Sequence, residues 1–128
     1  PEKTIRALRK IDEFRRMCDF WEIRMTSDHW VIVSVNEKES GKFLVQDNHD
    51  KEHINNALEN AIRQIDEPKS LVIVTLCYEN PMINLLNRTR KGIEMFLERR
   101  NSLPHSKTQY KLTEWGPVTN NQEEQNRI

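Results

Sequence analysis

The chain has few of the features that most often reveal a function from sequence alone. Only three of its 128 residues are glycine, namely Gly41, Gly92 and Gly116. So few glycines exclude the glycine-rich loops that cradle phosphates and dinucleotides. The two cysteines, Cys18 and Cys77, are too few for a disulfide framework, so we expect an intracellular, reducing compartment. No motif for nucleophilic catalysis is present either.

Long apolar runs and an excess of charge are also absent. No stretch approaches the roughly 18 consecutive apolar residues that cross a membrane, so we expect no membrane partner. Charged residues make up 31% of the chain, but 20 basic residues balance 20 acidic ones and the formal net charge is zero. Net charge therefore predicts no strong attraction to nucleic acid, although a local basic face is compatible with it.

The most informative stretch that is present is the apolar run at residues 70–78, which is rich in β-branched side chains. Its length favours a strand, and the lack of alternation predicts cover on both faces. Such a strand needs helices packed over at least one face. The run therefore predicts a mixed α/β domain with this strand at its centre.

Periodicity along the rest of the chain predicts a helix, an antiparallel meander of three strands, a helix, the central strand, a long helix and a final edge strand. These elements cover residues 4–18, 20–26, 30–36, 42–46, 50–65, 70–78, 80–100 and 110–115. We expect a mixed five-stranded sheet, with the central strand parallel to one meander strand because a helix intervenes. A single domain would cover residues 1–117, and a disordered polar tail would follow at 118–128.

Local signals refine the boundaries. Asp50 is a typical N-cap for the second helix, and Asn80 followed by Pro81 predicts the start of the third. Gly92, in the middle of the third helix, predicts a bend or a division. The stretch 39–41 predicts the turn between the second and third strands.

The first helix is predicted to be amphipathic, with its apolar stripe on one side and basic residues opposite. The stripe consists of Ile5, Leu8, Ile11, Phe14, Met17 and Cys18, and the basic residues are Arg6, Arg9, Lys10 and Arg16. A solvated face is the ordinary interpretation of such a basic side. The alternative is a face that binds phosphate or acidic groups.

The order of elements after the first helix resembles the ribonuclease H-like fold. The best local match is residues 71–75, leading through Tyr78 to 83–85, which is similar to the family's fourth strand and the start of its next helix. The resemblance spans about residues 21–115. It implies a nuclease with two divalent metals, held by acidic residues on the first strand, the first crossover helix and the end of the fourth strand.

The acidic pattern that the resemblance implies is only partly present. Leu76 occupies the position where the family has an aspartate. The residues that can be nominated are Glu22 on the first strand, Glu59 (or Glu52) on the helix and Glu79 after the fourth strand. We therefore favour a non-catalytic relative without catalytic residues, metal or cofactor, and keep a metal-dependent nuclease as an alternative.

Two smaller constellations have both a chemical and a structural interpretation. His49 and His53 have a metal-ligand spacing, but no third ligand is evident and the nearby Asp50 suits a helix start. Cys77 precedes a helix N-terminus, a setting that lowers a thiol pKa. Because it also belongs to the apolar run, we expect an inert cysteine.

Two surfaces are predicted to bind partners. A basic region on the third helix and the following segment would contact a phosphate backbone; it contains Arg88, Arg90, Lys91, Arg99, Arg100, Lys107 and Lys111. Phe20, Trp30 and Ile32 would form an apolar patch for a protein. We predict a non-catalytic adaptor domain that joins a larger intracellular assembly through protein contacts, with nucleic-acid binding as the alternative.

Overall fold

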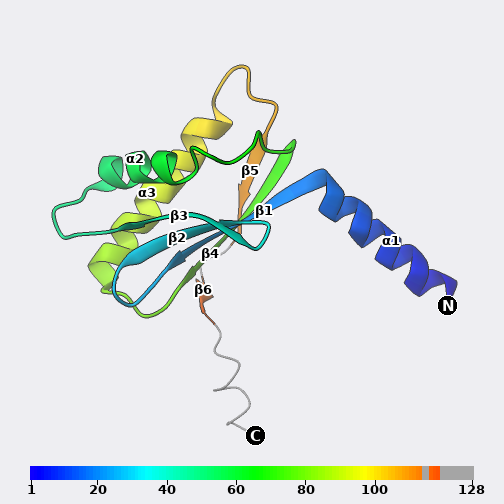
Figure 1. Cartoon of the computed structure of the whole chain (residues 1–128), viewed down its shortest axis with the longest axis horizontal. Helices are drawn as coiled ribbons and strands as arrows, with labels where there is room; N and C mark the ends of the chain where they lie inside the picture. Colours follow the sequence, from blue (N-terminus) through cyan, green and yellow to red (C-terminus); the bar gives the residue numbers. More distant parts are fainter. Residues whose placement is uncertain (114–115, 119–128) are drawn as a thin grey trace, which may run out of the picture.

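The structure is a computed structural model that describes residues 1–113 and 116–118. These residues form three helices and one sheet (Figure 1). The elements are α1 (Glu2–Met17), β1 (Cys18–Met25), β2 (Trp30–Val35), β3 (Lys38–Leu44), α2 (Lys51–Ala61), β4 (Leu71–Tyr78), α3 (Ile83–Asn101), β5 (Gln109–Leu112) and β6 (Gly116–Pro117). The predicted fold class and order of elements are confirmed. Residues 114–115 of the predicted last strand and residues 119–128 of the predicted tail lie outside the described residues.

The sheet has the strand order β3-β2-β1-β4-β5, and the two-residue β6 pairs with the end of β4. Strands β1, β2 and β3 form the predicted antiparallel meander. Strand β4 runs parallel to β1 and to β5, so the apolar run is an interior strand of a mixed sheet, next to the middle strand β1. The parallel pairing follows from the intervening α2, which carries the chain back across the sheet.

One face of the sheet holds the core. Alternate side chains of β1, β2 and β4 point to this face, where α2 and α3 cover them. None of these side chains is more than 2% exposed: Trp21, Ile23, Met25, Val31, Val33, Val72, Val74 and Leu76. From the helices, Ile54, Leu58, Ile93 and Phe96 meet them with no exposed surface.

The expected cover on both faces of the central strand is wrong. The outward side chains of β4 alternate with the buried ones; Leu71, Ile73 and Cys77 are half-buried and Thr75 is exposed. Neither α2 nor α3 packs on this second face, which we call the open face. It comprises Phe20, Glu22, Arg24, Trp30, Ile32, Ser34, Leu71, Ile73, Thr75 and Cys77. The apolar run wrongly indicated cover on both faces because its outward side chains are largely apolar although no helix covers them.

The turn between β2 and β3 lies at Asn36 and Glu37, not at the predicted 39–41. Their φ angles are 50° and 71°, as a two-residue hairpin requires, and asparagine tolerates this region better than most residues. Gly41 lies inside β3, where a Cβ would stand 2.5 Å from the carbonyl oxygen of Ala61. The glycine therefore allows the end of α2 to approach β3 closely.

Helix α3 begins at Ile83 and not at the predicted Asn80 and Pro81. Asn80 has a φ of 51°, so it turns the chain instead of capping a helix. Met82 is the N-cap residue, and its backbone N–H donates to Nε2 of His29 at 3.1 Å. A side chain from the loop between β1 and β2 thus accepts a hydrogen bond from the backbone at the start of α3.

Helices α2 and α3 pack closely against each other. Asp50 caps α2 as predicted, because its side chain accepts a hydrogen bond from the backbone N–H of His53 at 2.8 Å. The helix ends at Ala61, earlier than the predicted residue 65. Gly92 neither bends nor divides α3; a Cβ there would stand 2.6 Å from Cγ2 of Ile54. The glycine marks the point of closest approach between the two helices.

Candidate interaction surfaces

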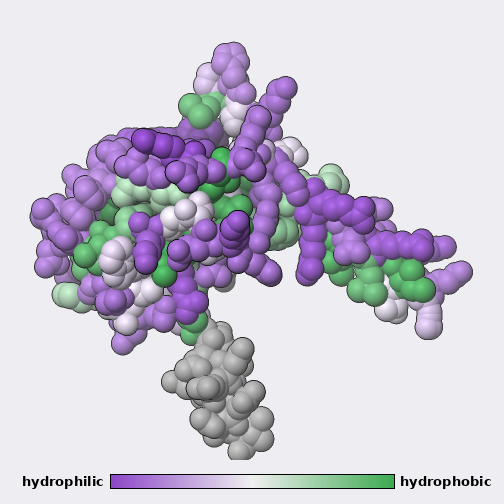
Figure 2. All heavy atoms as spheres, viewed as in Figure 1, coloured by the Kyte–Doolittle hydropathy of each residue, from purple (hydrophilic) through white to green (hydrophobic). Residues whose placement is uncertain are grey.

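Helix α1 carries most of the exposed apolar surface. Five of the nine large apolar side chains that are exposed in the described residues lie on it. They are Ile5, Leu8, Ile11, Phe14 and Met17, with exposed fractions of 49–66%, and no residue of α1 is buried. Figure 1 shows α1 projecting from the rest of the molecule, and Figure 2 shows the apolar side chains gathered along one side of it. The stripe predicted from the sequence is therefore present but uncovered.

The other residues that the structure describes do not bury the apolar stripe of α1. Isolated helices shorter than about 12–15 residues are marginal in water, and packing of the apolar face supplies most of the stability of a helix in a protein. Helix α1 has 16 residues, and its N-cap residue, Pro1, makes no side-chain capping bond. It also carries six basic and three acidic residues, a net charge of +3. Its exposed stripe and positive charge together define a candidate binding surface.

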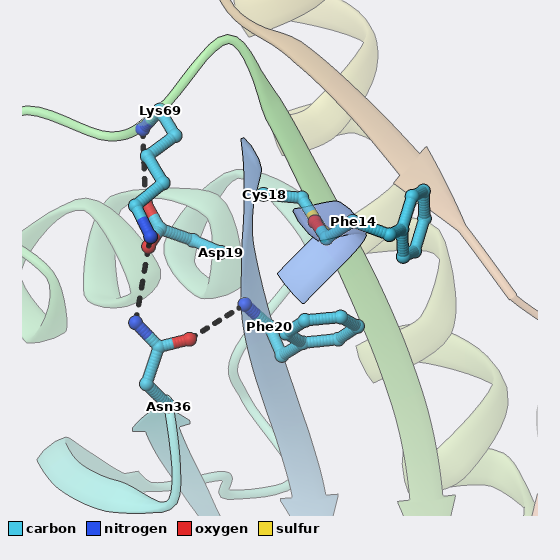
Figure 3. A network of polar contacts seen from close by, with 6 residues as sticks. All are labelled: Phe14, Cys18, Asp19, Phe20, Asn36 and Lys69. Carbon is cyan, nitrogen blue, oxygen red and sulfur yellow. Dashed lines mark hydrogen bonds and ion pairs between the residues drawn. The ribbon is translucent and has the colours of Figure 1, made fainter. Parts of the chain in front are cut away.

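A polar network fixes the start of β1, directly after α1 (Figure 3). Asp19, which is 9% exposed, accepts hydrogen bonds from Nδ2 of Asn36 at 3.0 Å and from the backbone N–H of Lys69 at 2.9 Å. Oδ1 of Asn36 in turn accepts from the backbone N–H of Phe20 at 2.9 Å. Sequence reasoning missed Asp19 and Asn36, although a carboxylate at a buried strand position was an available signal.

The junction between α1 and β1 contains no loop. Met17 ends the helix and Cys18 begins the strand. Sγ of Cys18 donates to the carbonyl oxygen of Phe14 at 3.1 Å, and the Phe14 ring meets the edge of Phe20 with ring centroids 6.5 Å apart. The direction of α1 is therefore tied to the direction of β1.

The predicted apolar patch lies on the open face, but its members are not contiguous. The pairing register places Ile32 opposite Arg24, four residues along β1 from Phe20. Trp30 lies at the far end of β2 and is half-buried, with Nζ of Lys42 at 5.4 Å from its ring. The structure therefore brings Phe20, Trp30 and Ile32 to one face, as two separate apolar areas.

An acidic hollow adjoins Phe20 on the open face. Its volume is 360 Å³, and its lining consists of Phe20, Trp21, Glu22, Ser34, Glu37 and Thr75. Two carboxylates, those of Glu22 and Glu37, belong to this lining, and no basic residue does. The hollow thus combines an apolar wall with negative charge.

Cys77 lies on the open face near Glu22. Burial, followed by the charge of the neighbouring Glu22 carboxylate, raises the pKa of its thiol to about 11. The thiol is therefore protonated at neutral pH, which agrees with the expected inert cysteine and not with a nucleophile.

The three nominated acidic residues are divided between the two sides of the sheet. Glu79 accepts a hydrogen bond from Nε of Arg24 at 2.7 Å, next to the open face that carries Glu22. Glu59 lies on α2, across the sheet, and pairs with Arg100 at 2.9 Å. In residues 1–113 and 116–118, no three His, Cys, Asp or Glu side chains are placed to hold a metal ion.

His49 and His53 stack instead of converging on a shared point. Their ring centroids are 3.6 Å apart, with an angle of 12° between the planes. Nδ1 of His49 accepts a hydrogen bond from the backbone N–H of Gln46 at 3.0 Å. Burial, followed by the charge of His53, lowers the pKa of His49. The pair serves the packing of the loop before α2.

Four of the seven residues in the predicted basic region bind acceptors inside the molecule. Arg88 donates to the carbonyl oxygens of Asp47 and His49, and three arginines form the ion pairs Arg90–Glu94, Arg99–Glu52 and Arg100–Glu59 at 2.7–2.9 Å. Arg100 also lies over the rings of Phe96 and Tyr110. The unpaired cations of this region are Lys91, Lys107 and Lys111 within the described part of the chain.

Comparisons with known proteins add no family. No protein-family model, curated protein or solved structure matches the chain. Among the described helices, none is both long and apolar enough to cross a bilayer. The function therefore has to be argued from the surfaces of this molecule.

Proposed function

We propose that this protein is a non-catalytic protein-binding domain, acting as an adaptor or subunit of a larger assembly, and that α1 makes its main contact. The observation that carries the proposal is the stripe of five apolar side chains on α1, each about half exposed or more. Contiguous exposed apolar surface of this kind marks binding sites. Amphipathic helices commonly bind proteins through side chains that recur every three or four residues, and Leu8, Ile11 and Phe14 recur every three.

We further propose that the fold is a ribonuclease H-like one that has lost its catalytic site. The order of elements after α1, three strands followed by helix, strand, helix and strand, supports the relationship. Leu76, only 1% exposed, fills the position of the implied aspartate with a buried apolar side chain. Glu59 is already paired with Arg100 across the sheet from Glu22. These two observations support a binding role over a nuclease.

Nucleic-acid binding through the basic region has less support. Four of its seven cations are already bound within the molecule, which leaves three lysines for phosphate groups. A titration with single- and double-stranded DNA and RNA at two salt concentrations tests this alternative. Affinity that falls steeply with salt would favour it, because phosphate contacts release counterions.

The test of the protein-binding function compares complexes formed by the full chain with those of two variants that change its charge equally. Ile11→Glu places a carboxylate in the apolar stripe, whereas Arg9→Gln alters the opposite side of the helix. We expect complexes in cross-linking and light scattering that persist with Arg9→Gln and disappear with Ile11→Glu. If neither a second copy nor another protein binds through α1, the proposed function is wrong.

A further inference from the structure

We propose that α1 binds a second copy of this chain, and that each copy lays its α1 across the open face of the other. The result is a reciprocal dimer with two-fold symmetry. The inference rests on the proposed function, because it names the partner of the same helix. The two uncovered surfaces match each other in length and apolar character, and an acidic hollow on the open face complements the positive charge of α1.

The apolar stripe of α1 and the open face belong to one chain but are held apart within it. Helix α1 passes into β1 without a loop, since Met17 and Cys18 are consecutive ends of the two elements. The hydrogen bonds of Asp19 to Asn36 and Lys69 fix the start of that strand. Helix α1 therefore points away from the sheet of its own copy, as Figure 1 shows. The open face of a second copy can therefore cover α1, whereas the open face of its own copy is out of reach of the helix.

Helix α1 and the open face match in length and in apolar character. A helix of 16 residues is about 24 Å long, and strands β1 and β4, of eight residues each, span about 26 Å. The open face offers half-exposed or half-buried apolar side chains along this span: Phe20, Ile32, Leu71, Ile73 and Cys77. A helix packed on them would complete a second layer like the one that α2 and α3 form on the other face. The reciprocal arrangement doubles the contact, which brings it towards the roughly 800 Å² per partner of a stable interface.

The charge of α1 is complementary to that of the hollow on the open face. Helix α1 has a net charge of +3, and the hollow beside Phe20 is lined by the carboxylates of Glu22 and Glu37. The basic residues that flank the stripe, Lys3 and Arg15, would reach acidic groups on the open face of the partner. Complementary charge of this kind sets the orientation of a helix on its site.

Pairing of α1 with α1 alone explains less. It would bring the flanking Lys3 and Arg15 of two helices together, and like charges across a helix pair repel. Sixteen residues make little more than two heptads, a short length for a stable coiled coil. Such pairing would also leave the open face uncovered.

The test uses the full chain and one variant of each surface. Ile11→Lys introduces a charge into the stripe of α1, and Thr75→Arg introduces one at an exposed position of the open face, opposite Glu22 in the register. Glu13→Gln on the polar side of α1 and Gln64→Arg after α2 are controls that add the same charge elsewhere. Sedimentation equilibrium over a range of concentrations gives the dissociation constant of the dimer. Far-UV circular dichroism checks that each variant folds.

We expect the parent chain and both controls to form the same dimer, and each surface variant to weaken it at least tenfold. Mixing the two surface variants provides the sharpest measurement. In the mixed dimer, the unmodified helix of one copy meets the unmodified face of the other, so one of the two contacts is restored. The mixture should therefore dimerise more strongly than either variant alone.

Other outcomes overturn the inference in distinguishable ways. A dimer that Ile11→Lys breaks and Thr75→Arg leaves intact would mean pairing of α1 with α1. A parent chain that is monomeric at every concentration would exclude the dimer, while the proposed function would survive if another protein still required Ile11. Binding of a monomer to phosphatidylserine vesicles, lost in Ile11→Lys, would mean a lipid surface instead of a second copy.

Discussion

Helices α1 and α2 have similar sequence patterns, but the apolar stripe of α2 is buried and that of α1 is exposed. Both are amphipathic and both were predicted from an apolar stripe. Helix α2 buries Ile54 and Leu58 completely, whereas α1 leaves Leu8 and Ile11 about half exposed. The comparison shows that an amphipathic pattern specifies that a face needs cover, and that it does not specify whether the same copy of the chain provides that cover.

The structural difference between the two helices lies in what holds their ends and flanks. Helix α2 is capped by Asp50, ends against Gly41 of β3 and packs beside Gly92 of α3. Each of these contacts comes from an element of the same copy. Helix α1 has no side-chain cap and touches the rest of the chain through Phe14 and Cys18 near its last turn. The following experiments test this contrast.

The largest effect is expected for leucines at matching positions of the two stripes. Leu58→Ala should lower the free energy of unfolding by about 2–5 kcal/mol, because it leaves a cavity in the core. Leu8→Ala should change it by less than about 0.5 kcal/mol when the chain is dilute, because Leu8 is exposed there. Urea unfolding at low and high protein concentration measures both. Equal costs at low concentration would contradict the contrast between the helices.

A smaller effect is expected when a side chain is added at Gly41, beside the end of α2. Gly41→Ala should destabilise the fold by about 1–3 kcal/mol, since its Cβ would stand only 2.5 Å from the backbone oxygen of Ala61. Gly116→Ala is the matched control, because a Cβ there meets nothing within 4 Å. Thermal unfolding compares the two variants. Similar melting temperatures would mean that α2 does not depend on close approach to β3.

The capping residue of α2 has an effect of intermediate size. Asp50→Ala should cost about 1 kcal/mol, because the N–H of His53 loses its acceptor. Asp50→Asn keeps an acceptor and should cost much less. Denaturant unfolding provides both values, and equal losses would show that the charge of Asp50, not its hydrogen bond, stabilises the helix. Helix α1 has no equivalent bond to remove.

The smallest effect concerns the uncovered side of the sheet, and it is measured as reactivity. The pKa of Cys77 is raised from its ordinary 9.0 to about 11, so alkylation by iodoacetamide at neutral pH should be much slower in the folded chain than in the unfolded one. Because the folded pKa lies above the unfolded pKa, the stabilising contribution of this thiol is complete below pH 9 and is lost as the pH rises towards 11.

Glu22→Gln provides the control for the cysteine. Removing the carboxylate should lower the pKa of Cys77 and speed alkylation, which peptide mapping distinguishes from any reaction of Cys18. Unchanged reactivity would show that the two side chains do not interact across the open face.

Periodic apolar patterns predicted the elements of the fold and their order. The stripe of α2, the alternation of Trp21, Ile23 and Met25, and the apolar run of β4 each carry a signal that depends only on local geometry. The parallel pairing of β4 followed from the helix before it. Asp50 was a correct cap because its hydrogen bond lies within its own helix.

The errors came where a residue acts through a distant part of the chain. Gly41 and Gly92 were interpreted as a turn and a bend, but their small size serves contacts with Ala61 and Ile54. The basic region of α3 and the following segment was predicted to contact a phosphate backbone. Arg90 pairs with Glu94 four residues on, but the other three arginines of the region bind acceptors far away in the sequence, such as Glu52 for Arg99. No local pattern contains these partners.

The direct passage from Met17 to Cys18 has a mechanical consequence. A tether attached to α1 would pull along the axis of β1, the strand that lies between β2 and β4. Such a load would stress the hydrogen bonds on both flanks of β1 simultaneously and in shear, so no single pair would open first. Force applied to the protruding helix is therefore transmitted directly to β1, the middle strand of the sheet.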